Sequence, residues 1–261
     1  MKKDFLWGGA LSNVQAEGGY LEDGKGLNVY DTLVVTPEPG IKPMFCTTDV
    51  ATDHYHHWKE DIDYMAEMGF KAYRFSVVWS RIHPLGNEEK PNEAGLKYYE
   101  DIFKECHKYG IEPLVTINHF DCPIYLIKKI GGWRSREMIN YFYKLCKTLF
   151  IRYKGLVKYW LTFNEINMIL HFPFVAAGLC FEEGENETQA MITAVHHQLL
   201  ASAMATKLAH EIDKENKIGS MVAYFTTYPY TCKPADALAM QKDDQMKNLF
   251  YLDILNGGKY P

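Results

Sequence analysis

An amide and a carboxyl stand side by side near the middle of the chain. Asn164 and Glu165 come after the apolar run 157–161 and two further residues, where a buried strand is expected to end. A carboxyl in apolar surroundings resists ionisation, as a proton donor working near neutral pH must. The amide beside it can hold a substrate hydroxyl. For an isolated Asn-Glu pair, capping of the following helix is the commoner explanation, so the rest of the chain must decide.

The elements that would position this pair alternate along the chain. Short apolar runs predict strands at 5–10, 72–77, 112–118, 158–163 and 218–225. Helical periodicity predicts helices at about 55–68, 96–106, 135–155, 188–212 and from 235 onwards. This alternation is typical of βα units that build one parallel sheet, and no linker marks a second domain.

Composition excludes several classes of partner. The 261 residues are 47% hydrophobic and 14% aromatic, which is enough for a large core. A net charge of -5 gives no basic footprint, so neither nucleic acid nor an anionic membrane is expected as a partner. No secretory signal is evident, and no apolar segment approaches the roughly 20 residues that cross a bilayer. A small, neutral or modestly charged ligand fits better.

Cysteine and histidine spacing predicts neither disulfides nor a metal site. The six cysteines are scattered without a C-x-x-C pair, which indicates reduced thiols and a cytoplasmic protein. Cys106 and Cys146 fall on apolar helix faces and are expected in the core. His54, His56 and His57 are close in sequence, but no zinc-ligand spacing accompanies them. We expect no metal and no cofactor.

Polar side chains also follow the other predicted strands. Gln15 comes after the first strand, Arg74 lies in the second, and His119 follows the third. Amide and imidazole groups can donate and accept hydrogen bonds, as the neighbouring hydroxyls of a sugar require. Arg74 is a fixed cation that can hold a carboxylate ionised. Because the carboxyl ends of barrel strands meet at one rim, these residues and the Asn164-Glu165 pair predict a shared polar pocket.

Six ordered motifs resemble the family 1 glycoside hydrolases, and the resemblance runs from Phe5 to Pro261. The motifs are Phe5-Leu6-Trp7-Gly8-Gly9-Ala10, Gln15-Ala16-Glu17-Gly18, Asp53-His54-Tyr55-His56, Tyr73-Arg74-Phe75-Ser76, Asn118-His119-Phe120-Asp121-Cys122-Pro123 and Thr162-Phe163-Asn164-Glu165. This resemblance implies a (β/α)8 TIM barrel and a retaining mechanism.

The resemblance also assigns roles to the candidate residues. It implies that Glu165 is the general acid/base and that Asn164 holds the sugar 2-hydroxyl. Gln15 and His119 would bind ring hydroxyls, and Arg74 would lie against the nucleophile.

Within the family, several segments look like the 6-phospho-β-glucosidase branch. They are Asn13 and residues 166–171, 181–186 and 234–237. That branch cleaves phosphorylated β-glucosides taken up by bacterial sugar transport, so the expected partner is a small phosphorylated β-glucoside. The residues that bind the phosphate in that branch lie in its C-terminal third.

The strand spacing predicts that the barrel is incomplete. Successive strands start roughly 40 to 65 residues apart, so eight such units would need well over roughly 400 residues. The expected fold is therefore α/β, with the first five βα units of a TIM barrel, and residues 1–261 are the N-terminal portion of one domain. An open arc of strands favours a homo-oligomer or association through the open barrel edges.

The catalytic pair is also expected to be incomplete. A retaining glycosidase uses two carboxyls about 5 Å apart. The resemblance places the nucleophile in a Thr-Glu-Asn-Gly motif, which does not occur in the chain. Asp121, Glu17 and Asp53 are expected to support loops or helix starts instead. The chain is therefore expected to be inactive alone, with a non-catalytic sugar-binding module or a structural remnant as the alternatives.

Overall fold

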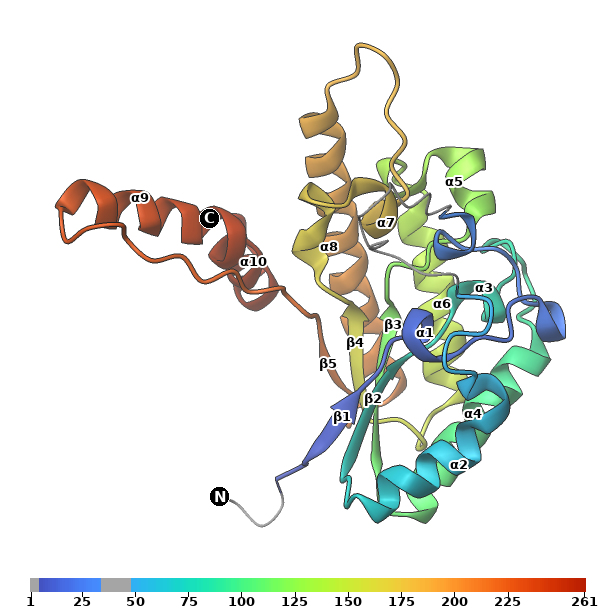
Figure 1. Cartoon of the computed structure of the whole chain (residues 1–261). Helices are drawn as coiled ribbons and strands as arrows, with labels where there is room; N and C mark the ends of the chain where they lie inside the picture. The colour runs from blue at the N-terminus through green and yellow to red at the C-terminus, as the bar shows by residue number, and fades with distance from the viewer. Residues whose placement is uncertain (1–4, 34–47) are drawn as a thin grey trace, which may run out of the picture.

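Five parallel strands form one sheet in the computed structural model, which describes residues 5–33 and 48–261 (Figure 1). The strands are β1 (Gly8–Ala10), β2 (Ala72–Ser76), β3 (Glu112–Asn118), β4 (Tyr159–Phe163) and β5 (Lys217–Gly219). They lie in sequence order, and each pairs only with its neighbours along the chain. The prediction of consecutive βα units is confirmed. Cys46 lies outside the described residues.

Helices connect the strands, and two more helices follow β5. The bounds are α1 (Asn13–Ala16), α2 (His54–Glu67), α3 (Trp79–Ile82), α4 (Glu93–Lys108), α5 (Ile124–Ile130), α6 (Met138–Arg152), α7 (Pro173–Ala177), α8 (Glu187–Ile212), α9 (Pro234–Asp244) and α10 (Phe250–Gly257). Single 3-10 turns are η1 (Glu22–Gly24), η2 (Tyr30–Thr32), η3 (Gly132–Arg134) and η4 (Ile166–Leu170), and a π-helical turn, η5 (Gln245–Leu249), joins α9 to α10. In the described residues no helix is long and apolar enough to cross a membrane.

The long helices α2, α4, α6 and α8 cover one face of the sheet (Figure 1). Alternate strand residues point to this face, because successive side chains of a strand alternate. Phe75 of β2 packs on Phe103 of α4, and Trp160 of β4 packs on Phe150 of α6. Cys106 and Cys146 are fully buried here, as expected. The core therefore lies between the sheet and its helices.

The opposite face of the sheet carries the remaining side chains of each strand, because successive side chains alternate between the two faces. Arg74, Leu114 and Leu161 are only partly buried, although they occupy the middle of the sheet. A methyl group on Gly219 would lie 3.4 Å from Leu161 Cδ2, so β5 continues this face. In a closed barrel this face would be the interior, where side chains from all strands fill the space.

The end of β5 differs from the prediction. The strand stops at Gly219 rather than continuing to Phe225. Beyond it, Met221 N still donates to Phe163 O at 3.0 Å. The backbone N–H groups of Ala223 and Phe225 donate to side-chain oxygens of Asn167 and Asn248, each at 2.9 Å. Side-chain amides therefore replace the hydrogen bonds that a neighbouring strand would make. Strand propensity cannot predict this, because it depends on residues far away in the sequence.

Two other predicted boundaries were also wrong. The first strand begins at Gly8 rather than Phe5, since residues 5–7 are exposed and only Trp7 O accepts hydrogen bonds from β2's start. The helix expected to begin with a Ser135 cap begins at Met138. Ser135 Oγ instead accepts from Glu137 N at 3.2 Å, in the turn that follows η3.

Candidate functional site

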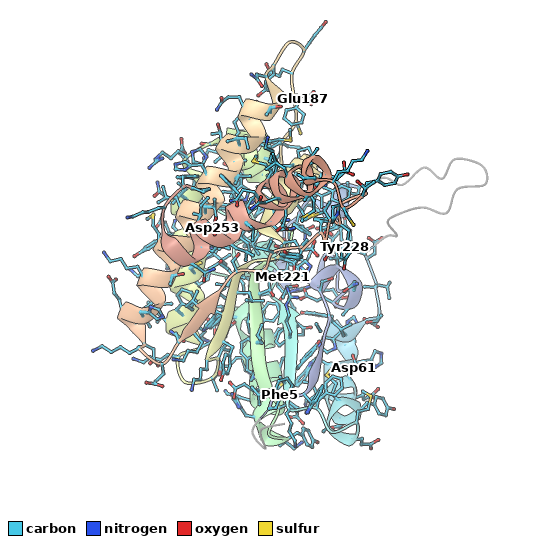
Figure 2. The ribbon with its side chains drawn as sticks, turned by 90° about the vertical axis from the view of Figure 1, so that its left-hand side faces the viewer. Phe5, Asp61, Glu187, Met221, Tyr228 and Asp253 are labelled. Carbon is cyan, nitrogen blue, oxygen red and sulfur yellow. The ribbon has the colours of Figure 1, made fainter. Side chains whose placement is uncertain are left out.

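The carboxyl ends of β2, β3 and β4 lie side by side and carry most of the predicted site residues. Asn164 N donates to Asn118 O at 2.9 Å, which holds the residue after β4 against the last residue of β3. Both side chains are buried. Figure 2 shows Phe5 at the opposite end of the strands from Met221, the residue that pairs with the end of β4. The site therefore lies at the rim that the strand order predicts.

Arg74 joins the strands through its side chain. Its Nη2 donates to Asn164 Oδ1 at 2.6 Å, and its Nε donates to Thr116 Oγ1 at 3.1 Å. Burial lowers the pKa of Arg74, and the nearby Glu165 carboxylate opposes this shift. Arg74, Asn164 and Glu165 therefore form one charged and polar cluster. Thr116 was missed in the sequence, although it shares the strand face of Asn118 at a spacing of two.

Glu165 adopts an unusual backbone conformation. Its φ of 42° and ψ of 56° lie in the left-handed region, which a residue with a Cβ avoids at a cost of about 1–3 kcal/mol. The flanks hold it there: Ile166 N donates to Met221 O at 2.9 Å, and Glu165 O accepts from Met168 N at 2.8 Å. Ile166 is buried. Strained backbone conformations of this kind are common at functional sites. Here the conformation gives the Glu165 side chain a direction that a regular strand would not.

His119 lies directly after β3 and is partly buried. Burial and the positive charge of Arg74 lower the pKa of His119 to about 3. Its Nδ1 is buried without a hydrogen-bond partner among the described residues. This lowered pKa favours the neutral imidazole near pH 7, which presents one donor and one acceptor.

A pH-dependent stability follows from this buried imidazole. As pH falls below the usual histidine pKa of about 6.5, the unfolded chain binds a proton that the folded chain refuses until about pH 3. The contribution of His119 to the free energy of unfolding should therefore fall with pH in this window, by up to about 1.4 kcal/mol per pH unit, whereas Asp121, whose pKa is raised, contributes in the opposite sense. His119→Gln should lose less stability between pH 6.5 and pH 4 in urea titrations. Exposed His210→Gln is the matched control, and equal slopes for wild type and His119→Gln would contradict the expectation.

Asp121 fixes the loop that carries His119. Its Oδ1 accepts from His119 N at 3.0 Å, and its Oδ2 accepts from Trp79 N at 2.6 Å. Burial raises the pKa of Asp121 to about 7, against the opposing effect of these N–H donors. Both carboxylate oxygens of Asp121 therefore accept hydrogen bonds from backbone N–H groups, in agreement with the loop-supporting role expected from the sequence.

Glu17 and Asp53 have structural partners as well. Glu17 Oε1 accepts from Arg81 Nε at 2.6 Å, and Glu17 Oε2 accepts from Tyr99 OH at 2.5 Å, all in the buried interior. Asp53 directly precedes α2, and its Oδ1 lies 2.6 Å from His56 Nδ1. Loop and helix-start roles therefore explain these carboxyls.

Gln15 stands somewhat apart from the other candidates. It follows β1 within α1, and its Oε1 accepts from both the backbone N and the Oγ of Ser12, at 3.0 and 2.9 Å. Next to it, Asn13 N donates to Ser76 Oγ at 2.8 Å, so α1 is fixed to the end of β2. The Gln15 side chain is exposed at the same rim. Within the described residues no hydrogen bond joins it to Arg74, His119, Asn164 or Glu165.

Tyr30 is a neighbour of the site that the sequence did not indicate. Its pKa is raised by burial and by the charges of Asp121 and Glu165. It comes from η2, in a loop between β1 and α2. Tyr30 does not belong to a strand, so strand periodicity could not predict its position, which depends on the fold of this loop.

The chain is similar in sequence to known proteins over its whole length. The family model described as Glycosyl hydrolase family 1 matches residues 1–261. Among curated relatives, a 6-phospho-beta-glucosidase, AscB, of Escherichia coli is 48% identical over 99% of this chain. An aryl-phospho-beta-D-glucosidase, BglH, of Bacillus subtilis is 49% identical over 98% of it. The chain spans only 57% and 55% of these two relatives.

Solved structures give the same result for the fold. A family 1 b-glucosidase from Thermotoga maritima superimposes with a TM-score of 0.87 at 35% identity, and the match covers 100% of this chain and 58% of that one. A rice beta-glucosidase, Os3BGlu6, gives a TM-score of 0.89 at 30% identity. The five-stranded sheet is therefore the first part of a (β/α)8 barrel. The chain belongs to glycosyl hydrolase family 1.

Proposed function

We propose that this chain supplies the acid/base part of a retaining β-glycoside hydrolase that acts on 6-phospho-β-glucosides. The observation that carries the proposal is the Arg74–Asn164 hydrogen bond of 2.6 Å, which joins β2 to the residue that follows β4, beside Glu165. Barrel enzymes do their chemistry at this rim. The relatives named as phospho-β-glucosidases support the substrate class.

Glu165 would act first as an acid and then as a base. In the first step its proton passes to the glycosidic oxygen while the bond from that oxygen to the anomeric carbon breaks and a second carboxylate attacks the carbon. In the second step the Glu165 carboxylate takes a proton from water, whose oxygen displaces the second carboxylate. Tyr30 and Arg74, whose charges and dipoles lie near Glu165, would shape this proton transfer.

The neighbouring residues would bind the sugar. Asn164 is proposed to hold the 2-hydroxyl, and Gln15 and His119 the other ring hydroxyls. A neutral His119 suits this task, because it can both donate to and accept from a hydroxyl. We propose a cytoplasmic location, which suits a phosphorylated substrate and the free thiols of the five described cysteines.

The second carboxylate is not supplied by the described residues near the site. Glu17 is bound by Arg81 and Tyr99, and Asp121 by backbone N–H groups. We therefore propose that the nucleophile and the phosphate-binding residues belong to the part of the family domain that this chain does not match. Arg74, which holds a carboxylate ionised at short range, would lie against that nucleophile.

A direct assay tests the missing nucleophile. The purified chain should release no p-nitrophenol from p-nitrophenyl 6-phospho-β-glucoside above its own Glu165→Gln variant, because loss of one member of a catalytic pair costs several orders of magnitude. Both proteins should first show the same unfolding midpoint in urea. Turnover by the chain that Glu165→Gln abolishes would refute the proposal that the nucleophile lies elsewhere.

A further inference from the structure

Three polar side chains of the core line one cavity, and each has an atom without a hydrogen-bond partner among the described residues. These atoms are Nε2 of His54 in α2, and the hydroxyl oxygens of Tyr73 in β2 and Tyr98 in α4. The three residues are only 4%, 1% and 9% exposed. Leaving a buried polar group without a hydrogen bond is destabilising, so native proteins rarely gather three such groups in one place. The cluster therefore indicates a ligand.

The cavity between these side chains limits the size of that ligand. It has a volume of about 10 Å³ and lies between α1, α2, β2 and α4. This volume is at the lower end of the roughly 10–15 Å³ that one buried water molecule requires. The rings of His54 and Tyr73 meet edge to face, with their centres 6.1 Å apart, so two of the polar groups are close neighbours. The space fits one water molecule and is too small for an organic ligand.

The donors and acceptors of the cluster also match water. His54 Nδ1 lies 2.6 Å from Asp61 Oδ2, and a carboxylate can only accept, so in the neutral ring the proton is assigned to Nδ1 and Nε2 is an acceptor. Burial raises the pKa of Tyr73 and of Tyr98, so both hydroxyls keep a hydrogen to donate. A water molecule that donates to Nε2 and accepts from both hydroxyls makes three hydrogen bonds, the number typical of buried waters.

The same inventory argues against a metal cation. Glu17 is the one acidic side chain among the described residues that line the cavity, and its two oxygens already accept from Arg81 and Tyr99. Calcium and magnesium ions bind about six or more oxygen ligands, several of them from carboxylates or water. Two neutral phenol hydroxyls and one imidazole nitrogen do not supply such a set. A neutral molecule that both donates and accepts hydrogen bonds is the better match.

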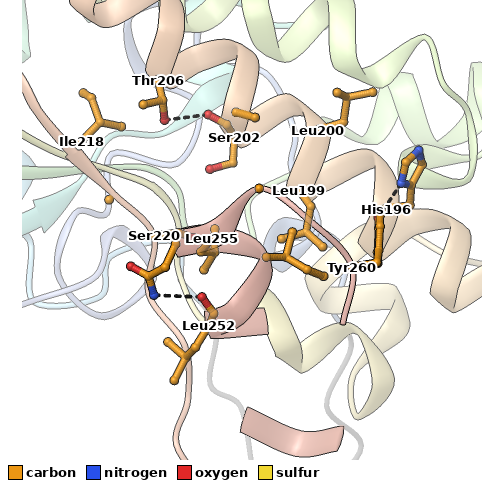
Figure 3. A pocket seen from close by; sticks show the side chains of 15 residues that line it. His196, Leu199, Leu200, Ser202, Thr206, Ile218, Ser220, Leu252, Leu255 and Tyr260 are labelled. Carbon is orange, nitrogen blue, oxygen red and sulfur yellow. Dashed lines mark hydrogen bonds between the residues drawn. The ribbon is translucent and has the colours of Figure 1, made fainter. Parts of the chain in front are cut away.

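A larger cavity of about 590 Å³, between α8, β5 and α10, gives no comparable signal (Figure 3). Polar groups on its walls bind the protein itself: Thr206 Oγ1 donates to Ser202 O at 2.9 Å, and Asn256 Nδ2 donates to Leu252 O at 2.8 Å. Among the described residues, no buried side-chain atom that lacks a partner belongs to these walls. Unpartnered polar atoms, rather than volume, therefore single out the small cavity.

We propose that one structural water molecule occupies the small cavity and joins α2, β2 and α4 through hydrogen bonds to His54, Tyr73 and Tyr98. We call it the core water. It donates to His54 Nε2 and accepts from the two tyrosine hydroxyls. Ser12 and Ala16 line the same cavity, so the core water also lies beneath α1, the helix that contains Gln15. This role is structural and does not depend on the proposed function.

Removal of single hydroxyls tests the core water, because a hydrated and a dry cavity predict shifts of opposite sign. With the water present, Tyr73→Phe and Tyr98→Phe each remove a hydrogen bond and should lower the folding equilibrium constant about three- to tenfold, seen as a lower urea midpoint. In a dry cavity the same changes remove a buried hydroxyl that has no partner, and the midpoint should rise. Tyr64→Phe is the matched control, since Tyr64 is 61% exposed on α2, and its midpoint should not move.

Two further measurements address the shared position of the water. The double variant Tyr73→Phe/Tyr98→Phe should shift the midpoint by an amount that differs from the sum of the single shifts, because both hydroxyls bind the same molecule. A high-resolution crystal structure of the chain should show a water roughly 2.5–3.2 Å from His54 Nε2 and from both hydroxyls. A rise in the midpoint for either single variant, additive shifts in the double variant, or density that contacts fewer than two of the three atoms would overturn the proposal.

Discussion

In a fusion of this chain with the C-terminal part of BglH that it does not match, Glu165→Gln should lower kcat/KM by about 10²- to 10⁴-fold for a 6-phospho-β-glucoside with an alkyl leaving group. An alkoxide is a poor leaving group, so cleavage depends on the proton that Glu165 donates as the glycosidic bond breaks. Gln has nearly the same shape but no proton to give. A p-nitrophenolate leaves without much help, so the loss with the aryl substrate should be smaller in the glycosylation step.

The comparison of the two leaving groups is the decisive measurement. Steady-state kinetics with methyl and p-nitrophenyl 6-phospho-β-glucosides give kcat/KM for each, which reports the first irreversible step. Glu211→Gln is the control, because Glu211 is exposed near the end of α8. A loss of less than tenfold with the methyl glycoside, or equal losses with both substrates, would be inconsistent with an acid role for Glu165.

Arg81→Leu should destabilise the chain by about 3–5 kcal/mol, the largest effect on stability that the structure predicts. Arg81 is fully buried. Its Nε binds Glu17, its Nη2 donates to the carbonyls of Gly18 and Gly19, and its guanidinium lies 4.2 Å from the centre of the Tyr55 ring. Leu would leave the Glu17 carboxylate buried without its cation, which costs more than the intact pair contributes.

Urea unfolding of the chain measures this loss against a surface pair. Arg152 binds Glu93 and Glu100 at 2.6 and 2.8 Å, but it is 30% exposed, so Arg152→Leu should cost no more than about 1 kcal/mol. The m-values of the two variants should match if both unfold in one step. Equal shifts in the urea midpoint for Arg81→Leu and Arg152→Leu would show that loss of the buried ion pair costs no more stability than loss of the exposed one.

The interior strands were predictable because two independent patterns agreed on them. β2, β3 and β4 lie within one residue of their predicted bounds, since apolar runs and the helical stripes between them fix both ends. The bounds of the two edge strands, β1 and β5, were harder to predict. Residues 220–225 are as apolar as a strand, but the amides of Asn167 and Asn248 bind their backbone instead. Propensity describes a segment alone and does not see such a competitor.

The site was predictable where it follows strand phase. Arg74, His119, Asn164 and Glu165 were expected at one rim because parallel strands end together, and the structure places them there. Two features depend on folded loops and had no sequence signal. Tyr30 arrives from a connection of unpredictable path, and the left-handed backbone of Glu165 is imposed by the bond between Ile166 and Met221.

The hydrogen bond from Arg74 to Asn164 fixes the orientation of the Asn164 side-chain amide. A guanidinium can only donate, so the carboxamide must turn its oxygen towards Arg74 and its NH₂ away. Within the described residues that NH₂ has no other protein partner. A ligand group seated there must therefore accept a hydrogen bond: a hydroxyl or a fluorine substituent can do so, whereas the ammonium group of an amino sugar would be repelled.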